Sequence, residues 1–217
     1  MRTFGWPEFW FIVEAARWTL ALSAIAFVGG AALGLGIALA RTSNIGWLRN
    51  LALAFIKLFQ GTPLLLQLFL IFFGAPVIGL EIDPWIAAGV ALILNSAAFL
   101  GEIWRGCIEA VPHGQVEAAQ ALSLSWFNRM RDVILPQAAR IAVAPTVGYL
   151  VQIVKGTSLA AIIGFTEITR AGQIINNATF QPLVVFSVVA ALYFVLCWPL
   201  SRLASRLERH HKSANAT

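Results

Sequence analysis

Long stretches without charged residues divide this chain, and their lengths indicate its fold class. Residues 18–40, 58–80 and 84–101 contain no Asp, Glu, Lys or Arg, and neither do residues 171–201, whose densest apolar part begins near Phe180. Roughly 20 mostly apolar residues in a helix are enough to cross the hydrocarbon core of a bilayer. The pattern therefore predicts an all-α integral membrane protein.

One further apolar stretch is interrupted. Residues 141–154 are too short to cross a membrane alone, but apolar sequence resumes after Lys155 as residues 156–166. We interpret the two pieces as one broken span, which brings the expected number of spans to five. The spans are expected at about 18–40, 51–73, 84–104, 138–160 and 180–200 of a domain covering 18–207, between an extracytoplasmic N-terminal segment 1–17 and a cytoplasmic tail 208–217.

The first expected span is rich in glycine. Gly30 and Gly34 form a G-x-x-x-G pattern, with Gly29 and Gly36 nearby. Small residues at this spacing let two helix backbones approach closely within a membrane. The alternative is that these glycines only reflect the general abundance of glycine in membrane helices.

The composition agrees with a membrane protein. Among the 217 residues, 59% are apolar and 12% are charged, whereas soluble domains contain about 45–50% apolar and about 25% charged residues. The net charge is +5, but nucleic-acid binding requires a basic patch on a water-exposed face. No nucleic-acid partner is expected, and the basic excess is better explained by membrane orientation.

Orientation follows from the distribution of Lys and Arg, which concentrate in cytoplasmic loops. The other side holds Arg2, Arg17, Arg170 and Lys155, together with acidic residues such as Glu167. The N-terminus is therefore expected outside and the C-terminus inside, with the loop 105–140 in the cytoplasm. The ten residues that define the cytoplasmic side are Arg41, Arg49, Arg105, Arg129, Arg131, Arg140, Arg202, Arg206, Arg209 and Lys212.

Residues for catalysis or for binding a metal are not apparent. Cys107 and Cys197 lie far apart without metal-ligand spacing, and no His falls within a span. The sequence also lacks the G-x-x-x-x-G-K-[ST] loop that cradles phosphates and the G-x-S-x-G of many hydrolases. A membrane-embedded enzyme is the alternative that these absences disfavour, and no metal or cofactor is expected on this chain.

The cytoplasmic loop 109–140 carries a helical pattern. Val116, Ala119, Leu122, Trp126 and Met130 recur at helical spacing and form an apolar stripe on a polar segment. This pattern predicts an amphipathic surface helix. One explanation is a helix that rests on the membrane interface, anchored by aromatic side chains.

The residues of this loop point to a second explanation. Glu117-Ala118-Ala119, then Leu122 and the Leu-Pro at 135–136, resemble the E-A-A loop of permease subunits of binding-protein-dependent ABC importers. The glycine usual in that family is replaced by Ser123, where the helix must end and the chain must turn. Glycine adopts the left-handed conformation freely, whereas serine there costs roughly 1 kcal/mol.

This resemblance implies a type I importer permease fold with a coupling helix in the cytoplasmic loop. In the family, the coupling helix docks into a groove of the ATP-binding subunit, so ATP is bound by the partner. The implied partners are two copies of that subunit, a second permease copy or a paralogue, and an extracytoplasmic binding protein. The implied coupling residues are Glu117, Ala118, Ala119, Leu122 and Ser123.

Three other segments resemble the polar-amino-acid branch of these bacterial inner-membrane importers. Residues 60–68 resemble R-G-T-P-L-L-x-Q, residues 99–106 resemble A-Y-x-x-E-x-x-R-x-G, and residues 155–159 resemble K-D-T-S-L. Gln60 replaces the usual Arg, Phe99 the Tyr and Gly156 the Asp. The implied substrate is a polar amino acid, with another small polar solute as the alternative. A stand-alone channel or carrier would leave the coupling loop without a purpose.

Polar residues inside the apolar stretches are candidates for a substrate path, because they are costly at membrane depth. They lie in the second, third and fourth expected spans, with Lys155 at the outer mouth of the path. The alternative is that they hydrogen-bond neighbouring helices. The candidates are Gln67, Asn95, Gln152, Lys155, Thr157 and Ser158.

Overall fold

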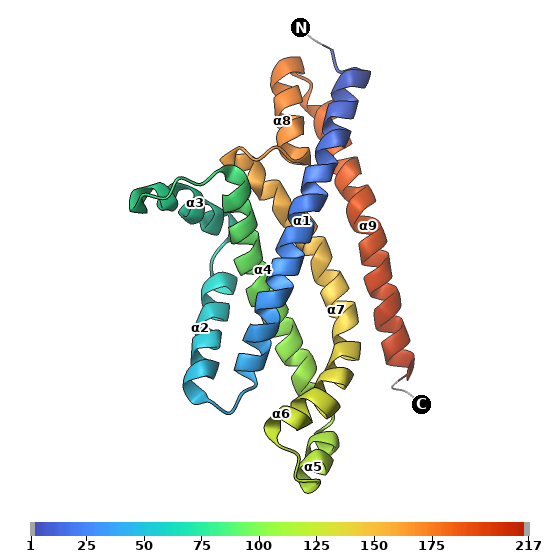
Figure 1. The fold of residues 1–217 in the computed structure, drawn as a ribbon. Helices are drawn as coiled ribbons and strands as arrows, with labels where there is room; N and C mark the ends of the chain where they lie inside the picture. The colour runs from blue at the N-terminus through green and yellow to red at the C-terminus, as the bar shows by residue number, and fades with distance from the viewer. Residues whose placement is uncertain (1–2, 215–217) are drawn as a thin grey trace.

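A computed structural model describes residues 3–214, with side chains through residue 209. Arg2 and the end of the expected tail, residues 215–217, lie outside the described part. Within it the chain forms helices and connecting turns and no strand, which confirms the all-α prediction (Figure 1). The helices are α1 (Trp6–Arg41), α2 (Gly46–Gly61), α3 (Leu64–Gly74), η1 (Ala75–Ile78), α4 (Pro84–Glu109), α5 (His113–Ala121), α6 (Trp126–Asn128), η2 (Arg129–Ile134), α7 (Leu135–Gly156), η3 (Thr157–Ile163), α8 (Ile168–Thr179) and α9 (Pro182–Ala214).

In the described residues, four segments are long and apolar enough to cross a membrane, or five if the bent pair α2–α3 counts as one span. Figure 1 shows α1 running diagonally across α4 and α7, while α9 lies along the outer edge of α7. The short helices α5 and α6 lie at one end of the bundle, which we term the α5 end, and α8 lies at the opposite end.

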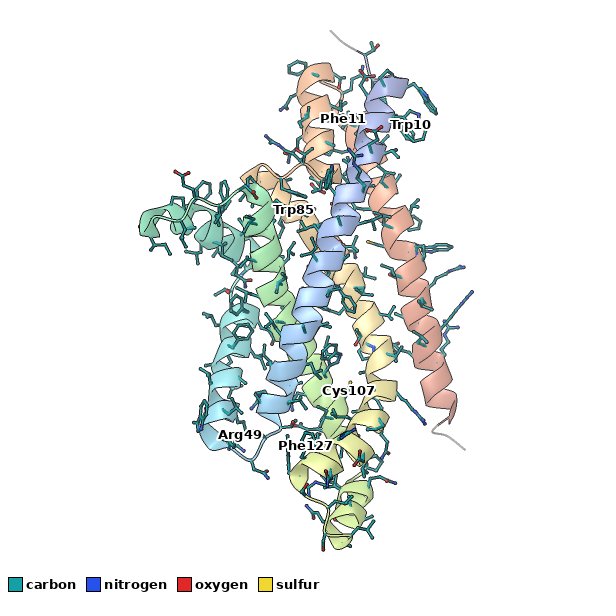
Figure 2. All side chains as sticks on the ribbon, in the orientation of Figure 1. Trp10, Phe11, Arg49, Trp85, Cys107 and Phe127 are labelled. Carbon is teal, nitrogen blue, oxygen red and sulfur yellow. The ribbon has the colours of Figure 1, made fainter. Side chains whose placement is uncertain are left out.

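The helix α4 forms the centre of the fold because small residues let its neighbours approach. Its inner surface includes Ala87, Ala88, Ala91 and Ala97, which are fully buried. Larger side chains fill the space near the end opposite α5: the ring of Trp85 stacks on Phe165 with ring centroids 4.9 Å apart (Figure 2). Burial of this kind supplies close packing, which is what holds helices together in lipid.

The first helix begins earlier than expected. The helix that contains the expected span from residue 18 runs continuously from Trp6 to Arg41, so no break in the helix marks the expected boundary after residue 17. No residue between positions 8 and 17 breaks a helix, and Pro7 is tolerated in a first turn, where its missing N–H costs nothing. The Glu8 carboxylate accepts the backbone N–H of Gly5 at 3.0 Å and caps the start.

The break expected in the fourth span occurs instead in the second. The expected span 51–73 is divided into α2 and α3, whose axes differ by 100°. Pro63 explains the break, since proline pushes the preceding residue out of the helical region, and Thr62 is extended with φ −117° and ψ 141°. By contrast, α7 continues through Lys155 to Gly156 and then tightens into η3.

Candidate functional site

The loop with the E-A-A pattern folds into a short helix at the α5 end of the molecule. Val111, Met130 and Ile134 form a buried cluster there, with Val116 and Trp126 packed against it. This cluster holds α5 against the helices that follow it. Phe127 lies exposed at the same end (Figure 2).

The structure corrects the expected single apolar stripe. The stripe from residue 116 to 130 is divided, because α5 ends at Ala121 and helical structure resumes at Trp126 with α6, followed by η2. Leu122, expected on the stripe, follows the end of α5 with 75% of its surface exposed, whereas Ala119 is only 3% exposed.

The E-A-A residues consequently have different surroundings. Glu117 and Ala118 are exposed, as is Leu122, so that these three side chains are free to contact another protein. Ala119 faces the interior of its own chain. The exposed surface formed by Glu117, Ala118 and Leu122 is the candidate coupling surface.

Ser123 terminates α5 in the conformation that glycine usually supplies. Its φ is +55°, in the left-handed region. The N–H of Leu124 bonds to the carbonyl of Ala119 at 3.1 Å, and the N–H of Ser123 bonds to that of Gln120 at 2.8 Å. This pair of bonds is the Schellman arrangement of a helix C-terminus.

Replacing Ser123 with glycine is therefore expected to stabilise the loop. The change removes the steric penalty of a Cβ in the left-handed region, roughly 1 kcal/mol, with a small loss from the more flexible unfolded chain. Hydrogen exchange of the α5 amides should slow in Ser123→Gly relative to the wild type. Unchanged or faster exchange of these amides would contradict this explanation of the turn.

The second candidate region surrounds the break between α2 and α3. The Gln67 side-chain amide donates to the carbonyls of Phe59 at 2.8 Å and Thr62 at 3.0 Å, and to the Thr62 hydroxyl at 2.9 Å. The two carbonyls lack their usual helical donors where the helix breaks, because Pro63 has no N–H and the N–H of Leu66 bonds to Pro63 instead. In lipid no water can replace the lost bonds, so Gln67 stabilises the broken backbone.

Asn95 on α4 joins the same network. Its side-chain amide donates to the Gln67 side-chain oxygen at 3.1 Å, and its own oxygen accepts the Tyr149 hydroxyl of α7 at 3.5 Å. Gln67 and Asn95 are both buried. The structure thus brings these two predicted residues together, and shows the helix-to-helix hydrogen bonding that was the alternative to a substrate path.

The other candidates lie along α7 and η3. Gln152 and Lys155 are exposed and lie one turn apart on α7, and their side chains form no hydrogen bond or ion pair with any described residue. Thr157 is fully buried and donates to the carbonyl of Val154, whereas Ser158 donates to that of Lys155. The six candidates therefore form two sets, the Gln67–Asn95 network and the residues from 152 to 158, of which Gln152 and Lys155 leave their polar ends unpaired.

Sequence reasoning missed a buried carboxylate. Glu167, treated as an outer-loop charge, is fully buried and caps α8 by accepting the backbone N–H groups of Thr169 and Arg170, each at 2.9 Å. The Tyr193 hydroxyl of α9 also donates to it. Burial raises the pKa of the Glu167 carboxyl, while these hydrogen bonds lower it. The available signal was its place directly before a helix, where acidic residues serve as caps.

The remaining charges of α4 are satisfied locally. Arg105 forms ion pairs with Glu102 and with Glu109, one turn away on either side. Among the described residues, no group of three or more His, Cys, Asp or Glu side chains is placed to hold a metal ion.

Comparisons with known proteins cover nearly the whole chain. Residues 30–212 match the model of a family described as binding-protein-dependent transport system inner membrane component. The chain is 39% identical over 210 residues to the glutamine transport system permease protein GlnP of Escherichia coli (strain K12), covering 95% of each. It is 38% identical over 190 residues to the probable amino-acid ABC transporter permease protein YckA of Bacillus subtilis (strain 168), covering 88% of this chain and 84% of that protein.

Solved structures agree in fold. A chain from the crystal structure of an amino acid ABC transporter with histidines superposes with a TM-score of 0.86 and 35% identity, covering 92% of this chain and 94% of that one. A chain of the inward-facing MetNI methionine ABC transporter superposes with a TM-score of 0.80 at 21% identity, covering 95% of this chain and 99% of that one. The second likeness concerns the fold alone.

Proposed function

The chain belongs to the family of inner membrane components of binding-protein-dependent transport systems. We propose, from this premise, that it transports a polar amino acid across the membrane. The support for this substrate class is the 39% identity to a glutamine permease along nearly the entire chain. The same substrate class recurs in the solved transporter at 35% identity. Another small polar solute is the alternative, since the paths of such solutes share the same need for polar groups.

The energy for transport comes, in this proposal, from a separate subunit. The chain lacks a phosphate-cradling glycine loop in its sequence, and the candidate coupling surface offers a docking site for a partner. We propose two ATP-binding subunits, a second permease copy or paralogue, and an extracytoplasmic binding protein that delivers the amino acid. ATP binds to the partner subunits and not to this chain.

The α5 end is proposed to face the cytoplasm, with the N-terminus outside and the C-terminus inside. Arg49 lies at this end (Figure 2). The last turns of α9 point toward it, and α8, which contains Arg170, lies at the opposite end (Figure 1). The concentration of Lys and Arg at one end supports this orientation.

Site-directed labelling tests the orientation. The native Cys107 and Cys197 are buried, so a cysteine-free background carrying exposed single cysteines is required. In intact cells, a membrane-impermeant maleimide should label Glu81→Cys but not Asn44→Cys, and inverted vesicles should reverse the pattern. Labelling of Asn44→Cys from outside would contradict the proposed topology.

The substrate path is proposed to pass the polar residues Gln67, Asn95, Gln152, Lys155, Thr157 and Ser158. A zwitterion is poorly solvated by hydrocarbon and needs polar partners along its route. Gln152 and Lys155 satisfy this need directly, because their polar ends are unpaired. Gln67 and Asn95 contribute mainly by stabilising the backbone at the break between α2 and α3. Direct contact with the solute is their secondary role.

Uptake into proteoliposomes tests the function. The complex, reconstituted with its binding protein and ATP, should accumulate one or more radiolabelled polar amino acids. Gln152→Leu should lower this uptake roughly tenfold, as expected when one hydrogen bond to a charged solute is lost. The exposed Asn50→Leu on α2 serves as the matched control and should transport normally.

Two outcomes would count against these proposals. If a sugar or a peptide, but no amino acid, stimulates ATP hydrolysis through the binding protein, the substrate class is wrong. If Gln152→Leu transports every amino acid with unchanged kinetics, the path lies elsewhere although the function stands.

A further inference from the structure

A cationic pocket lies at the α5 end, between the α1–α2 turn and the start of η2. It has a volume of about 630 Å³, and Arg41, Arg49 and Arg129 contribute to its lining. None of these three arginines forms an ion pair with a described residue, and the buried Nε of Arg41 has no hydrogen-bond partner. An unpaired guanidinium nitrogen removed from water is costly, so this pocket is electrostatically incomplete.

The other titratable groups in the pocket do not complete it. Glu102 interacts electrostatically with Arg41, and Glu109 also lines the pocket, but both carboxylates pair with Arg105. His113 adds no negative charge at any pH. The pocket is therefore complementary to an anion, and the planar guanidinium groups suit phosphate oxygens in particular.

An apolar cavity adjoins this pocket. It has a volume of about 480 Å³ and lies between α4 and α7, with Leu35 of α1 on its edge. Cys107, Ala142 and Val143 are among its lining residues, and the indole of Trp104 donates to Thr146 at 2.8 Å, so that the polar atoms of its wall are paired. A cavity of this kind suits a hydrocarbon chain and offers a polar ligand little.

The two hollows meet at one residue. Ile108 lines both, and the next wall residues, Ile134 of the pocket and Leu135 of the cavity, are neighbours in the chain. Figure 2 shows Cys107 of the cavity between α1 and α7, with Arg49 and Phe127 nearer the α5 end. The anion site lies beside the apolar cavity at the end of membrane-spanning helices. This arrangement matches a phospholipid, in which a charged headgroup is joined to apolar chains.

We infer that this composite site binds one anionic phospholipid, with its phosphate among Arg41, Arg49 and Arg129 and one acyl chain along the cavity beside Ile108. Basic pockets between membrane helices commonly hold lipid headgroups. The phosphate of the bound lipid would pair with these arginines, and its acyl chain would fill the cavity between α4 and α7. The inference is independent of which solute the transporter carries.

Lipid retention measures this binding without any transport assay. The whole transporter complex is reconstituted in vesicles of phosphatidylcholine containing phosphatidylglycerol, extracted with detergent and analysed by native mass spectrometry. The wild type should retain one phosphatidylglycerol per permease chain. The double variant Arg41→Gln, Arg129→Gln should retain at least about tenfold less of this lipid. Arg131→Gln is the matched control, because its side chain is 74% exposed and does not line the pocket.

Further variants separate the sources of phosphate and guard against misfolding. Ala142→Phe, which fills the cavity, should lose the lipid but keep any thermal stabilisation by inorganic phosphate. Arg49→Gln, at an exposed position, should weaken retention even if the double variant does not fold. Equal retention in Arg49→Gln and in the wild type would overturn the proposal.

Two other results would also overturn it. If Ala142→Phe retains the lipid while inorganic phosphate displaces it, the site binds a free anion. If Arg129→Gln releases the ATP-binding subunit without changing lipid retention, the pocket receives an acidic side chain of that partner instead.

Discussion

Replacing Ala118 with arginine is expected to lower ATP-driven uptake roughly 100-fold or more. Ala118 is exposed on α5 beside Glu117, and the proposed close-packed contact with the ATP-binding subunit would leave no room for a long side chain. Steric overlap and an unpaired buried charge each cost several kcal/mol. ATP hydrolysis should no longer respond to the loaded binding protein, as measured in proteoliposomes.

The control for this prediction is Ala118→Ser, which adds a single oxygen and should transport nearly normally. Ala119→Arg is a poorer test, since Ala119 is buried in its own chain and its replacement would disturb α5 itself. Normal uptake by Ala118→Arg, with the protein inserted at wild-type levels, would show that this surface is not the coupling element.

Replacing Gly30 with leucine is expected to prevent stable folding. A Cβ added at Gly30 would lie 2.5 Å from the Cβ of Ser96 and 3.2 Å from its carbonyl carbon on α4. Overpacking against backbone costs about 1–3 kcal/mol or more, and here it occurs where α1 and α4 approach. The folded fraction, measured by fluorescence-detected gel filtration of the detergent extract, should fall to near zero.

Gly36 on the same helix provides a matched control. A Cβ at Gly36 would meet no atom within 4 Å. Gly36→Leu therefore makes the same substitution in the same helix without a steric clash against α4. It should express and migrate like the wild type. If both variants fold equally well, the close approach of α1 and α4 does not determine stability.

Charge-free stretches were sufficient to predict the fold class. The all-α membrane architecture is confirmed, since about twenty apolar residues in a row have few other stable conformations. The type I importer permease fold, which the resemblance of the cytoplasmic loop implied, is confirmed as well. The glycine pattern at Gly30 and Gly34 left two explanations open, and the structure supports close helix packing. The predicted position of the helix break was wrong. Lys155 interrupts an apolar stretch without ending the helix, whereas Pro63 forces the preceding residue out of the helical conformation.

The sequence singled out candidate residues, whose roles stay predictions, but it could not predict their surroundings. Ser123 is left-handed at the position where the resemblance places a glycine. The division between exposed Ala118 and buried Ala119 depends on how α5 packs against η2. Likewise, the bond between Gln67 and Asn95 joins residues 28 positions apart, and periodicity in one segment cannot reveal a partner in another.

The cap on α8 makes the order of synthesis matter. The backbone N–H of Ile168 bonds to the Thr19 hydroxyl, 149 positions earlier in the chain, whereas the Tyr193 hydroxyl that donates to Glu167 lies 26 positions later. At about 5–20 residues per second, Tyr193 is made roughly 1–5 s after Glu167. During that interval the nascent chain carries an acidic group whose partner on α9 does not yet exist, so the bond from Tyr193 that completes the cap can form only once the last helix has been made.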